Sequence, residues 1–425
     1  MRSFIFLALV STFTSKCYVS AKWMNNIPDN KYLSELTIPG THDSYARYGN
    51  NAFAAPYAIC QDWTVEKQLE EGIRFFDVRF RPFKNSFTVH HGPVWQKKYG
   101  GDVFREFKDF LKKNPRETVL FSYKDETNGN PNLSPEPGSD DFKNILRGYL
   151  NNNDFKPWIY GKNNGENDGI MPTLGQARGK MVLIDKNGHG GWGLRNLAVK
   201  DDWQDPFDFT VDTSGCKYDP TYDGGSDPDC FKTNYFIKHS KINGIKNNMR
   251  KAGKSKSKLY LSFCSASSAP FGSSNRNIAN RINPKIKSFI RESSGNTKQV
   301  FGVVIFDFPT PDIIRNLIQY NPGQKKVCAT LENESRTNSW MVTEGTKSPH
   351  PGRYWKDNIA YVNLNRGCYL AAWVDMNYEG TKNYLLHKKD GRLISKSSND
   401  YLIKDDGWIY RWWANDISSF KCYCS

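Results

Sequence analysis

Between Leu36 and about Tyr320, short apolar runs alternate with amphipathic helical stretches, and this alternation limits the possible fold more than any other feature of the chain. Runs rich in β-branched and aromatic residues predict strands at 36–38, 75–78, 87–90, 118–123, 181–184, 259–263 and 300–306. Helical periodicity is clearest at 65–71, 103–113, 142–149, 245–252 and 312–320. Strands that alternate with helices are typical of an α/β architecture with a parallel sheet. We therefore expect this part of the chain to form a (β/α) barrel.

Three side chains with catalytic chemistry follow three of the predicted strands. His42 follows the strand at 36–38, Arg79 the strand at 75–78, and His91 the strand at 87–90. A barrel places its active site at the carboxyl ends of its strands. One imidazole can accept a proton, the other can donate one, and a guanidinium can hold a phosphate between them. This combination is suited to cleaving a phosphodiester without a metal ion.

Several motifs around these residues follow one another in a fixed order. They are Ile38–Ser44, Phe76–Arg79, His90–Pro93 and Asn114–Thr118, with weaker ones at Gly175–Lys180 and Val303–Asp307. In sequence and in order, these motifs resemble the X domain of the secreted, bacterial-type phosphatidylinositol-specific phospholipase C family, over about residues 22–322. The resemblance implies an irregular, TIM-like barrel that is not fully closed. It also implies an enzyme that cleaves phosphatidylinositol, and glycosyl-phosphatidylinositol anchors, to diacylglycerol and inositol 1,2-cyclic phosphate.

The resemblance further implies a role for each catalytic residue. His42 would be the general base that removes the proton of the inositol 2-hydroxyl, and His91 the general acid that protonates the diacylglycerol oxygen. Asp307 would orient His42 and Asp43 would orient His91, since a carboxylate on the far ring nitrogen fixes the tautomer of an imidazole. His90 competes with His91 because alternation along a strand sends their rings to opposite faces. His91 is favoured because it stands next to the glycine of the family motif.

Arg79 bears on whether the site needs a metal ion. Calcium-dependent relatives of the family place acidic or amide oxygens where this arginine stands, because a hard cation needs oxygen ligands. An arginine instead supplies a fixed positive charge and several N–H donors to a phosphate. Arg74 and Arg81 are nearby alternatives, but the Asp-Val-Arg motif matches at Arg79. The resemblance therefore implies a calcium-independent enzyme with no metal and no cofactor.

Recognition of the inositol headgroup rests on the resemblance alone. Lys124 and Arg178 match family positions that hydrogen-bond inositol hydroxyls, and Tyr235 would form an aromatic platform beneath the ring. The family has an aspartate two residues before that tyrosine, where this chain has Thr233. Either the register shifts across the long preceding loop, or another acid such as Asp229 replaces that aspartate.

Two other kinds of protein remain alternatives. Metal-dependent glycerophosphodiesterases and sphingomyelinase-D-like hydrolases also place two histidines on early strands of a barrel, but they share a Glu-x-Asp metal pair where this chain has Asp77-Val-Arg79. A lipid- or carbohydrate-binding protein built on a decayed barrel is the non-catalytic alternative. The joint presence of both histidines, Arg79 and the two orienting aspartates disfavours decay.

The chain divides into three parts by composition. Residues 1–21 have the basic start, short apolar stretch and small residues of a signal peptide. Residues 22–325 hold the catalytic motifs, and residues 326–425, rich in aromatic residues and cysteines, predict a small disulfide-tied β domain of unknown role. Of nine cysteines, Cys17 would leave with the signal, and an even set in an exported chain suggests disulfides. A Cys216–Cys230 link would tie down a long glycine-rich segment.

The formal net charge of +15 points to an anionic partner. The basic residues are scattered and form no nucleic-acid-binding motif, so a phosphatidylinositol-containing membrane surface and a small inositol phosphate are the expected partners. We expect a secreted, extracellular monomer that does not bind nucleic acid. Phe53–Tyr57 and the loop Ser265–Ser274 are candidate membrane contacts, with ordinary packing as the alternative.

Overall fold

The fold is described from a computed structural model of the chain. The structure describes residues 21–50, 55–126, 142–161, 171–185, 192–194, 241–266, 274–293, 299–333, 339–349, 359, 361–365, 367–373, 376–378, 383–389, 392–395, 402–403, 408–410 and 418–424. Several predictions lie outside these residues: the signal peptide up to residue 20, Tyr235 together with Thr233 and Asp229, and the Cys216–Cys230 link. Most of the candidate membrane loop Ser265–Ser274 and the first two residues of Phe53–Tyr57 also lie outside them.

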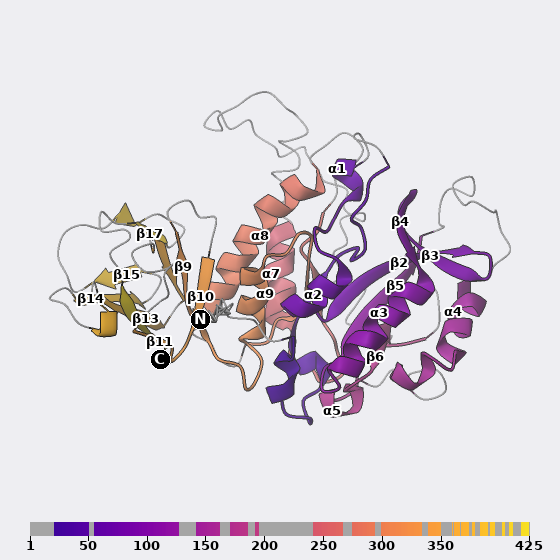
Figure 1. Cartoon of the computed structure of the whole chain (residues 1–425), viewed down its shortest axis with the longest axis horizontal. Helices are drawn as coiled ribbons and strands as arrows, with labels where there is room; N and C mark the ends of the chain where they lie inside the picture. The colour runs from indigo at the N-terminus through magenta and orange to yellow at the C-terminus, as the bar shows by residue number, and fades with distance from the viewer. Residues whose placement is uncertain are drawn as a thin grey trace, which may run out of the picture.

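Six parallel strands form the sheet at the centre of the larger body (Figure 1). In spatial order they are β7 (Leu261–Phe263), β8 (Gly302–Phe306), β1 (Thr37–Thr41), β2 (Phe75–Phe83), β5 (Val119–Asp125) and β6 (Met181–Ile184). Within the described residues β6 and β7 do not pair, so the curled sheet does not close. This is the irregular, TIM-like barrel that the sequence predicts, and the structure confirms it.

An antiparallel hairpin extends from the carboxyl half of β2. It consists of β3 (Ser86–His91) and β4 (Val94–Tyr99), and Phe80–Phe83 of β2 pair with β3 while the first part of β2 pairs with β5. The hairpin is therefore an edge of the sheet with one pleated face on the core: Val94 and Gln96 of β4 are buried, whereas Trp95 and Lys97 are exposed. Sequence analysis did not predict β4.

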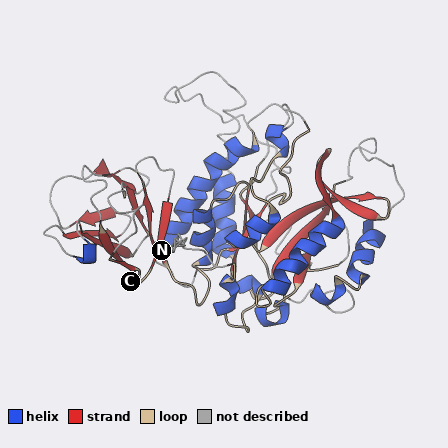
Figure 2. Ribbon diagram, in the orientation of Figure 1, coloured by secondary structure: helices blue, strands red, loops and turns tan. Residues whose placement is uncertain are grey.

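Helices cover the outside of the sheet, as Figure 2 shows. They are α1 (Ala55–Ala58), α2 (Val65–Glu71), α3 (Gly100–Lys113), α4 (Phe142–Asn151), α5 (Leu174–Ala177), α7 (Ile242–Lys251), α8 (Asn275–Glu292) and α9 (Pro311–Ile318). Helix α2 has clear local signals at both ends: the side chain of Thr64 accepts a hydrogen bond from the backbone N–H of Lys67, and Gly72 ends it with a φ of 106° that favours glycine.

The core explains why the sheet and the helices hold together. Strands buried on both faces read as continuous apolar runs, and the central ones here are rich in phenylalanine. Phe76 of β2 packs on Phe107 of α3 with ring centroids 4.9 Å apart, and Phe104 of α3 packs edge-on against Phe121 of β5. Burying one such ring contributes roughly 1.5–3 kcal/mol relative to leaving it exposed. No helix among the described residues is long and apolar enough to span a lipid bilayer.

The smaller body lies beyond α9 and contains only short strands and one 3-10 turn among its described residues. One five-stranded sheet has the order β10 (Ser339–Thr343), β9 (Val327–Glu332), β12 (Tyr361–Leu364), β17 (Trp408–Tyr410) and β16 (Leu402–Ile403). The other has the order β11 (Lys347–Ser348), β18 (Ser419–Cys424), β13 (Cys368–Trp373), β14 (Asn383–Lys389) and β15 (Arg392–Ser395). Their shared apolar core is separate from the barrel cores. A small β domain at the carboxyl end is confirmed.

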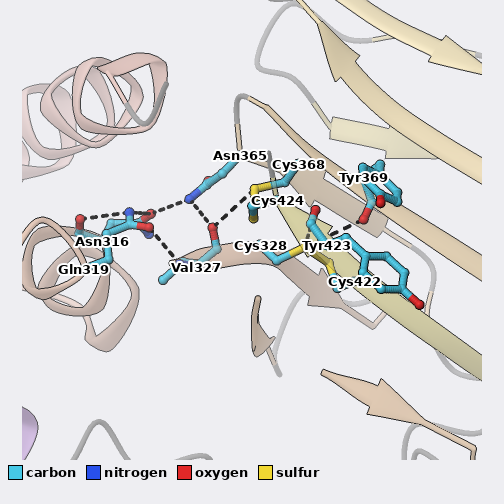
Figure 3. Close-up of a disulfide and its surroundings, with 10 residues drawn as sticks. All are labelled: Asn316, Gln319, Val327, Cys328, Asn365, Cys368, Tyr369, Cys422, Tyr423 and Cys424. Carbon is cyan, nitrogen blue, oxygen red and sulfur yellow. Dashed lines mark hydrogen bonds between the residues drawn. A yellow bond between two sulfur atoms is a disulfide. The ribbon is translucent and has the colours of Figure 1, made fainter. Parts of the chain in front are cut away.

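Two disulfides stabilise this β domain, Cys328–Cys422 and Cys368–Cys424 (Figure 3). The first joins β9 of one sheet to β18 of the other, so it fastens the two sheets together. The second joins neighbouring strands β13 and β18. Neither disulfide reaches the barrel. Cys60 and Cys264, which the even count of cysteines suggested would pair, are free and buried.

Polar contacts join the β domain to helices α8 and α9. Asp312 at the start of α9 accepts hydrogen bonds from Thr330 of β9 and pairs with Lys287 and Arg291 of α8, the latter at 3.3 Å. Arg291 also donates to Thr330, at 3.2 Å. A second set of contacts is visible in Figure 3, where Asn365 donates to Asn316 of α9. We call these contacts the polar junction.

The polar junction should depend on pH. Burial alone would raise the pKa of Asp312, but Arg291 and Lys287 hold it below its usual value. An aspartate with a lowered folded-state pKa stabilises the fold above its unfolded pKa of about 3.9, and this contribution is lost as the pH falls through the folded-state pKa. We expect Asp312→Asn to destabilise the protein by about 2 kcal/mol at neutral pH, since it removes a charged hydrogen-bond acceptor shared by Arg291 and Lys287.

Thermal unfolding followed by circular dichroism at neutral and strongly acidic pH tests this expectation. The difference between Asp312→Asn and the unmodified protein should shrink in acid, where Asp312 is protonated. Asp29→Asn is a matched control, because the Asp29 side chain is 58% exposed and lies away from the junction. A difference that stays constant over the whole pH range would contradict the ion-pair account.

Candidate functional site

His42 and Asp307 stand just beyond the carboxyl ends of two adjacent strands. Strands β1 and β8 run parallel in a register that pairs Thr41 with Phe306, and the next residue on each strand is His42 or Asp307. The backbone N–H of His42 donates to the carbonyl of Phe306, which extends the pairing by one step. The His42 Nδ1 and Asp307 Oδ1 atoms are 2.9 Å apart. The strand register alone therefore brings this imidazole–carboxylate pair together.

Neighbouring amides fix both members of the pair. The side-chain amide of Gln61 donates to the carbonyl of His42 at 2.7 Å and to that of Phe306 at 3.0 Å, while Asn283 of α8 donates to the carbonyl of Asp307 at 2.9 Å. His42 is nearly buried. Burial lowers the pKa of His42, but the charge and hydrogen bond of Asp307 more than offset this, so its pKa lies above the ordinary histidine value.

Arg79, from the outer part of β2, reaches the other side of the same imidazole. Its Nη2 lies 2.7 Å from His42 Nε2. A guanidinium can only donate, so Nε2 is the acceptor and the ring proton sits on Nδ1, facing Asp307. This assigns His42 as a neutral ring whose unprotonated nitrogen points to the place where Arg79 can hold an anion.

Three buried carboxylates surround the Arg79 guanidinium. Asp43 lies 3.4 Å and Asp77 3.9 Å from Nε, and Glu126 lies 3.1 Å from Nη1. Asp77 is itself held by Ser122, whose hydroxyl donates to it at 2.8 Å. Each of these acids is thus engaged by a fixed cation, and the three carboxylates orient the arginine rather than forming an open oxygen-ligand site.

His91 closes the opposite side of the site, at the end of β3. Its Nδ1 lies 3.6 Å from Asp43 Oδ2 and donates to the carbonyl of Ala58 at 2.7 Å. Asp43 directly follows His42 and has a φ of 37°, a left-handed conformation that is uncommon outside glycine. Burial raises the pKa of Asp43, and Arg79 and His91 oppose that rise. Asp43 thus stands between the guanidinium and the second imidazole.

Alternation along β3 turns the His90 ring to the face opposite that of His91. His90 is buried beside Arg81, and burial together with that positive charge lowers its pKa to about 4. An imidazole with such a pKa is neutral near pH 7 and is a poor proton donor. The structure therefore places His91, rather than its neighbour, beside Asp43, which in turn lies beside the Arg79 guanidinium.

Glu126 is a site residue that sequence analysis missed. Its carboxylate pairs with Arg79 and with Lys124, the latter at 3.0 Å, and accepts the backbone N–H of Gly92 at 3.0 Å. Burial would raise the pKa of Glu126, yet Arg79 and Lys124 hold it at about 2. Glu126 stands two residues after Lys124, the spacing that returns a side chain to the same face, and this spacing was the signal available in the sequence.

Of the three predicted headgroup residues, the structure brings only Lys124 to the site. Lys124 is in register with Arg79 across β2 and β5. Arg178 precedes β6, so it lies at the amino end of the parallel sheet, opposite His42. There it donates to the carbonyl of Ile27 and pairs with Asp29 at 2.6 Å. The assignment of Arg178 to the site is therefore corrected, and that of Tyr235 falls outside the described residues.

Chemically, the cluster is a base and an acid on either side of a fixed cation. His42 presents an unprotonated nitrogen, His91 is a second imidazole beside a carboxylate, and Arg79 supplies a fixed positive charge next to them. General acid–base transfer by positioned imidazoles and stabilisation of an anionic phosphorus centre are the two functions this geometry can combine.

Residues 36–187 match the family model described as phosphatidylinositol-specific phospholipase C, X domain. A 1-phosphatidylinositol phosphodiesterase of Listeria monocytogenes is 28% identical over 314 residues, which cover 71% of this chain and 84% of that protein. A protein of the same name from Staphylococcus aureus is 28% identical over 75% of this chain and 98% of its own length.

Solved structures of phosphatidylinositol-specific phospholipases C are also similar to this chain. The phosphatidylinositol-specific phospholipase C of Listeria monocytogenes superposes with a TM-score of 0.54 at 27% identity, covering 71% of this chain and 99% of that chain. A singly substituted form of the Staphylococcus aureus enzyme gives a TM-score of 0.55 at 28% identity, over 71% of this chain and 96% of that chain. The likeness thus spans nearly the whole of each relative but not the whole of this chain.

Proposed function

The chain belongs to the bacterial-type phosphatidylinositol-specific phospholipase C family, and on that premise we propose that it cleaves phosphatidylinositol to diacylglycerol and inositol 1,2-cyclic phosphate. Glycosyl-phosphatidylinositol anchors contain the same bond and are proposed as a second substrate. The observation that carries the proposal is the position of His42, between Asp307 on Nδ1 and Arg79 on Nε2.

The reaction would proceed by proton transfer at both ends of an intramolecular displacement. His42 Nε2 takes the proton of the inositol 2-hydroxyl, and the resulting oxygen attacks the neighbouring phosphorus while Arg79 holds a phosphate oxygen. The bond from phosphorus to the diacylglycerol oxygen breaks, and His91 donates a proton to that oxygen. Attack within one molecule is favoured because the nucleophile is already tethered beside phosphorus. Asp307 and Asp43 position the two rings, and Lys124 binds the inositol hydroxyls.

Phosphorus NMR of phosphatidylinositol vesicles incubated with the enzyme in the presence of a chelator tests this function. The first product should be the cyclic phosphate ester. A first product that is an open phosphomonoester would contradict attack by the 2-hydroxyl, and no turnover at all would contradict the proposed function.

Calcium independence is part of the proposal. Oxygen ligands are what a hard cation requires, and three buried acids of the site, Asp43, Asp77 and Glu126, are paired with Arg79 instead. The same pairing argues against a metal-dependent glycerophosphodiesterase or sphingomyelinase-D-like hydrolase. A protein that only binds its ligand would not need a proton acceptor such as His42 and a proton donor such as His91 in the same site.

The enzyme would work at a membrane surface that contains phosphatidylinositol, as a secreted monomer with no nucleic-acid partner. Two disulfides in the β domain support an oxidising, extracellular compartment. We assign residues 22–325 to catalysis, residues 326–425 to an accessory β domain, and residues 1–21 to a signal peptide.

An aromatic and basic patch, formed by the β3–β4 hairpin and by Tyr48 from the segment after β1, is the proposed membrane contact. Tyr48, Trp95 and Tyr99 are the large apolar side chains that stand out as exposed among the described residues, at 37%, 43% and 46%. Trp95 and Tyr99 contact each other edge-on, and Lys97 lies 4.3 Å above the Tyr48 ring. Aromatic rings and cations together suit the headgroup layer of an anionic bilayer. The patch shares its hairpin with His91.

Replacing this patch should separate membrane binding from chemistry. We expect Trp95→Ala to weaken binding to phosphatidylinositol vesicles about tenfold, since a lost aromatic contact is worth about 1.5 kcal/mol or more. Lys97→Glu should also weaken it, whereas Lys254→Glu, an exposed lysine at the amino end of the barrel, is the matched control. Vesicle sedimentation measures binding. Hydrolysis of soluble inositol cyclic phosphate should be unchanged in all three, and equal binding by Lys97→Glu and Lys254→Glu would contradict the assignment.

A further inference from the structure

A buried thiol borders the catalytic cluster without taking part in the proposed reaction. Cys60 follows α1, forms no disulfide and has no exposed surface. Its Sγ lies 3.9 Å from His91 Nδ1 and accepts a hydrogen bond from the Asn275 amide at 3.4 Å. Its backbone is tied to the same region, because its carbonyl accepts the N–H of Phe308.

The thiol completes a set of three metal-ligating atoms. One ring nitrogen of His42, Cys60 Sγ and one carboxylate oxygen of Asp307 all lie within 4.8 Å of one another. These residues come from the end of β1, the segment after α1 and the end of β8. Zinc bonds to such atoms are about 2.0–2.3 Å long, so a small inward movement of the three side chains would let one ion reach all of them.

The mixture of donors selects the class of ion. Imidazole nitrogen, thiolate sulfur and carboxylate oxygen are the ligands of zinc in proteins, and a thiolate favours soft or borderline metals over hard ones. Calcium prefers oxygen ligands and is therefore not expected to bind a set that includes a thiolate and an imidazole. We propose that zinc and similar thiophilic divalent ions bind reversibly to His42, Cys60 and Asp307 and thereby inhibit the enzyme.

Binding and inhibition follow from one exchange of protons. The ion replaces the proton on His42 Nδ1 and the proton of the Cys60 thiol, forming a metal–nitrogen and a metal–sulfur bond. A neutral His42 ring would then carry its proton on Nε2, so one proton goes to solvent in net terms. An Nε2 that bears hydrogen cannot accept another from the inositol hydroxyl or from Arg79. The inhibition therefore rests on the proposed function, whereas metal binding does not.

Cobalt is the probe for binding, because cobalt in a thiolate site absorbs by charge transfer from sulfur to the metal. We expect this near-ultraviolet absorption when cobalt is added to the unmodified protein, its loss in Cys60→Ser, and its retention in Cys264→Ser, the matched control that removes the other free thiol. Zinc should suppress the absorption by competition. Circular dichroism checks that each variant is folded.

Zinc inhibition of phosphatidylinositol hydrolysis is the second readout. Cys60→Ser should retain the basal rate and require at least about tenfold more zinc for half inhibition, since loss of a ligand weakens metal affinity by at least the 10–100-fold typical of its supporting groups. A chelator should restore the rate of the zinc-treated enzyme. Absence of the charge-transfer absorption from the unmodified protein, or its survival in folded Cys60→Ser, would overturn the metal site. An inactive enzyme that still binds cobalt through Cys60 would overturn only the proposed function.

Discussion

His42→Ala and His91→Ala are each expected to lower the rate of phosphatidylinositol cleavage by about 10²–10⁴-fold, the usual contribution of a general acid or base. His42 would be lost as the base, because its Nε2 is the unprotonated nitrogen that faces Arg79. His91 would be lost as the acid, because it is the imidazole backed by Asp43 on the opposite side. Initial rates on mixed-micelle substrate, with folding verified by circular dichroism, provide the measurement.

His90→Gln is the control for this pair, since His90 is adjacent in sequence but has its ring on the opposite face of β3 from His91, with a pKa of about 4. It should keep most of the activity. A substrate whose leaving group needs no proton distinguishes the two roles further: His91→Ala should recover much of its rate on a phenol ester of inositol phosphate, and His42→Ala should not. An inactive but folded His90→Gln together with an active His91→Ala would reverse the assignment.

Arg79→Lys should have the second large effect, about 10²–10³-fold on kcat, comparable to the removal of one preorganised donor from an anion-stabilising site. A lysine keeps the charge, but it cannot reach His42 Nε2, Asp43 and Glu126 at once as the planar guanidinium does. The loss should be the same with calcium or with a chelator in the assay.

Arg178→Lys is the matched control for Arg79→Lys. Arg178 also pairs with an aspartate, but it lies at the amino end of the sheet, and its replacement should leave both kcat and KM nearly unchanged. Strong stimulation of the unmodified enzyme by calcium would contradict the metal-independent mechanism and would favour assignment of the chain as a metal-dependent hydrolase. A large rise in KM in Arg178→Lys would return that residue to the headgroup site.

The barrel and the position of its site could be predicted because the apolar runs that mark the strands also show which residues follow each strand at its carboxyl end. His42 and Asp307 are far apart in sequence, yet each follows an apolar run, and parallel strands bring such residues to one edge. The same rule places Arg178 at the other edge of the sheet, because it precedes its strand, whereas the motif match alone predicts that it lies in the site. Glu126 stands two residues after Lys124 and so on the same face of the strand, but the motifs matched to the family do not include it.

Other elements carried weak or conflicting signals. Strand β4 contains Gln96, Lys97 and Lys98, so its sequence does not alternate between apolar and polar residues. Its side chains nevertheless alternate between buried and exposed positions, because the backbone N–H of Arg47 donates a hydrogen bond to the buried Gln96 side chain. Helix α8 contains Pro284, which normally ends a helix, yet its apolar face packs against α7 and α9. The Cys368–Cys424 disulfide depends on the pairing of β13 with β18, and the Cys328–Cys422 disulfide on the packing of one sheet against the other, neither of which cysteine spacing alone determines.

The polar junction has a consequence for the barrel considered by itself. Helices α8 and α9 meet the β domain through Asp312, Arg291 and Asn316, side chains that water can also satisfy. If the β domain were absent, these side chains would present polar surface to solvent on this flank of the barrel. Removal of the β domain would therefore uncover hydrogen-bonding groups at these three positions, which cost far less to hydrate than apolar side chains.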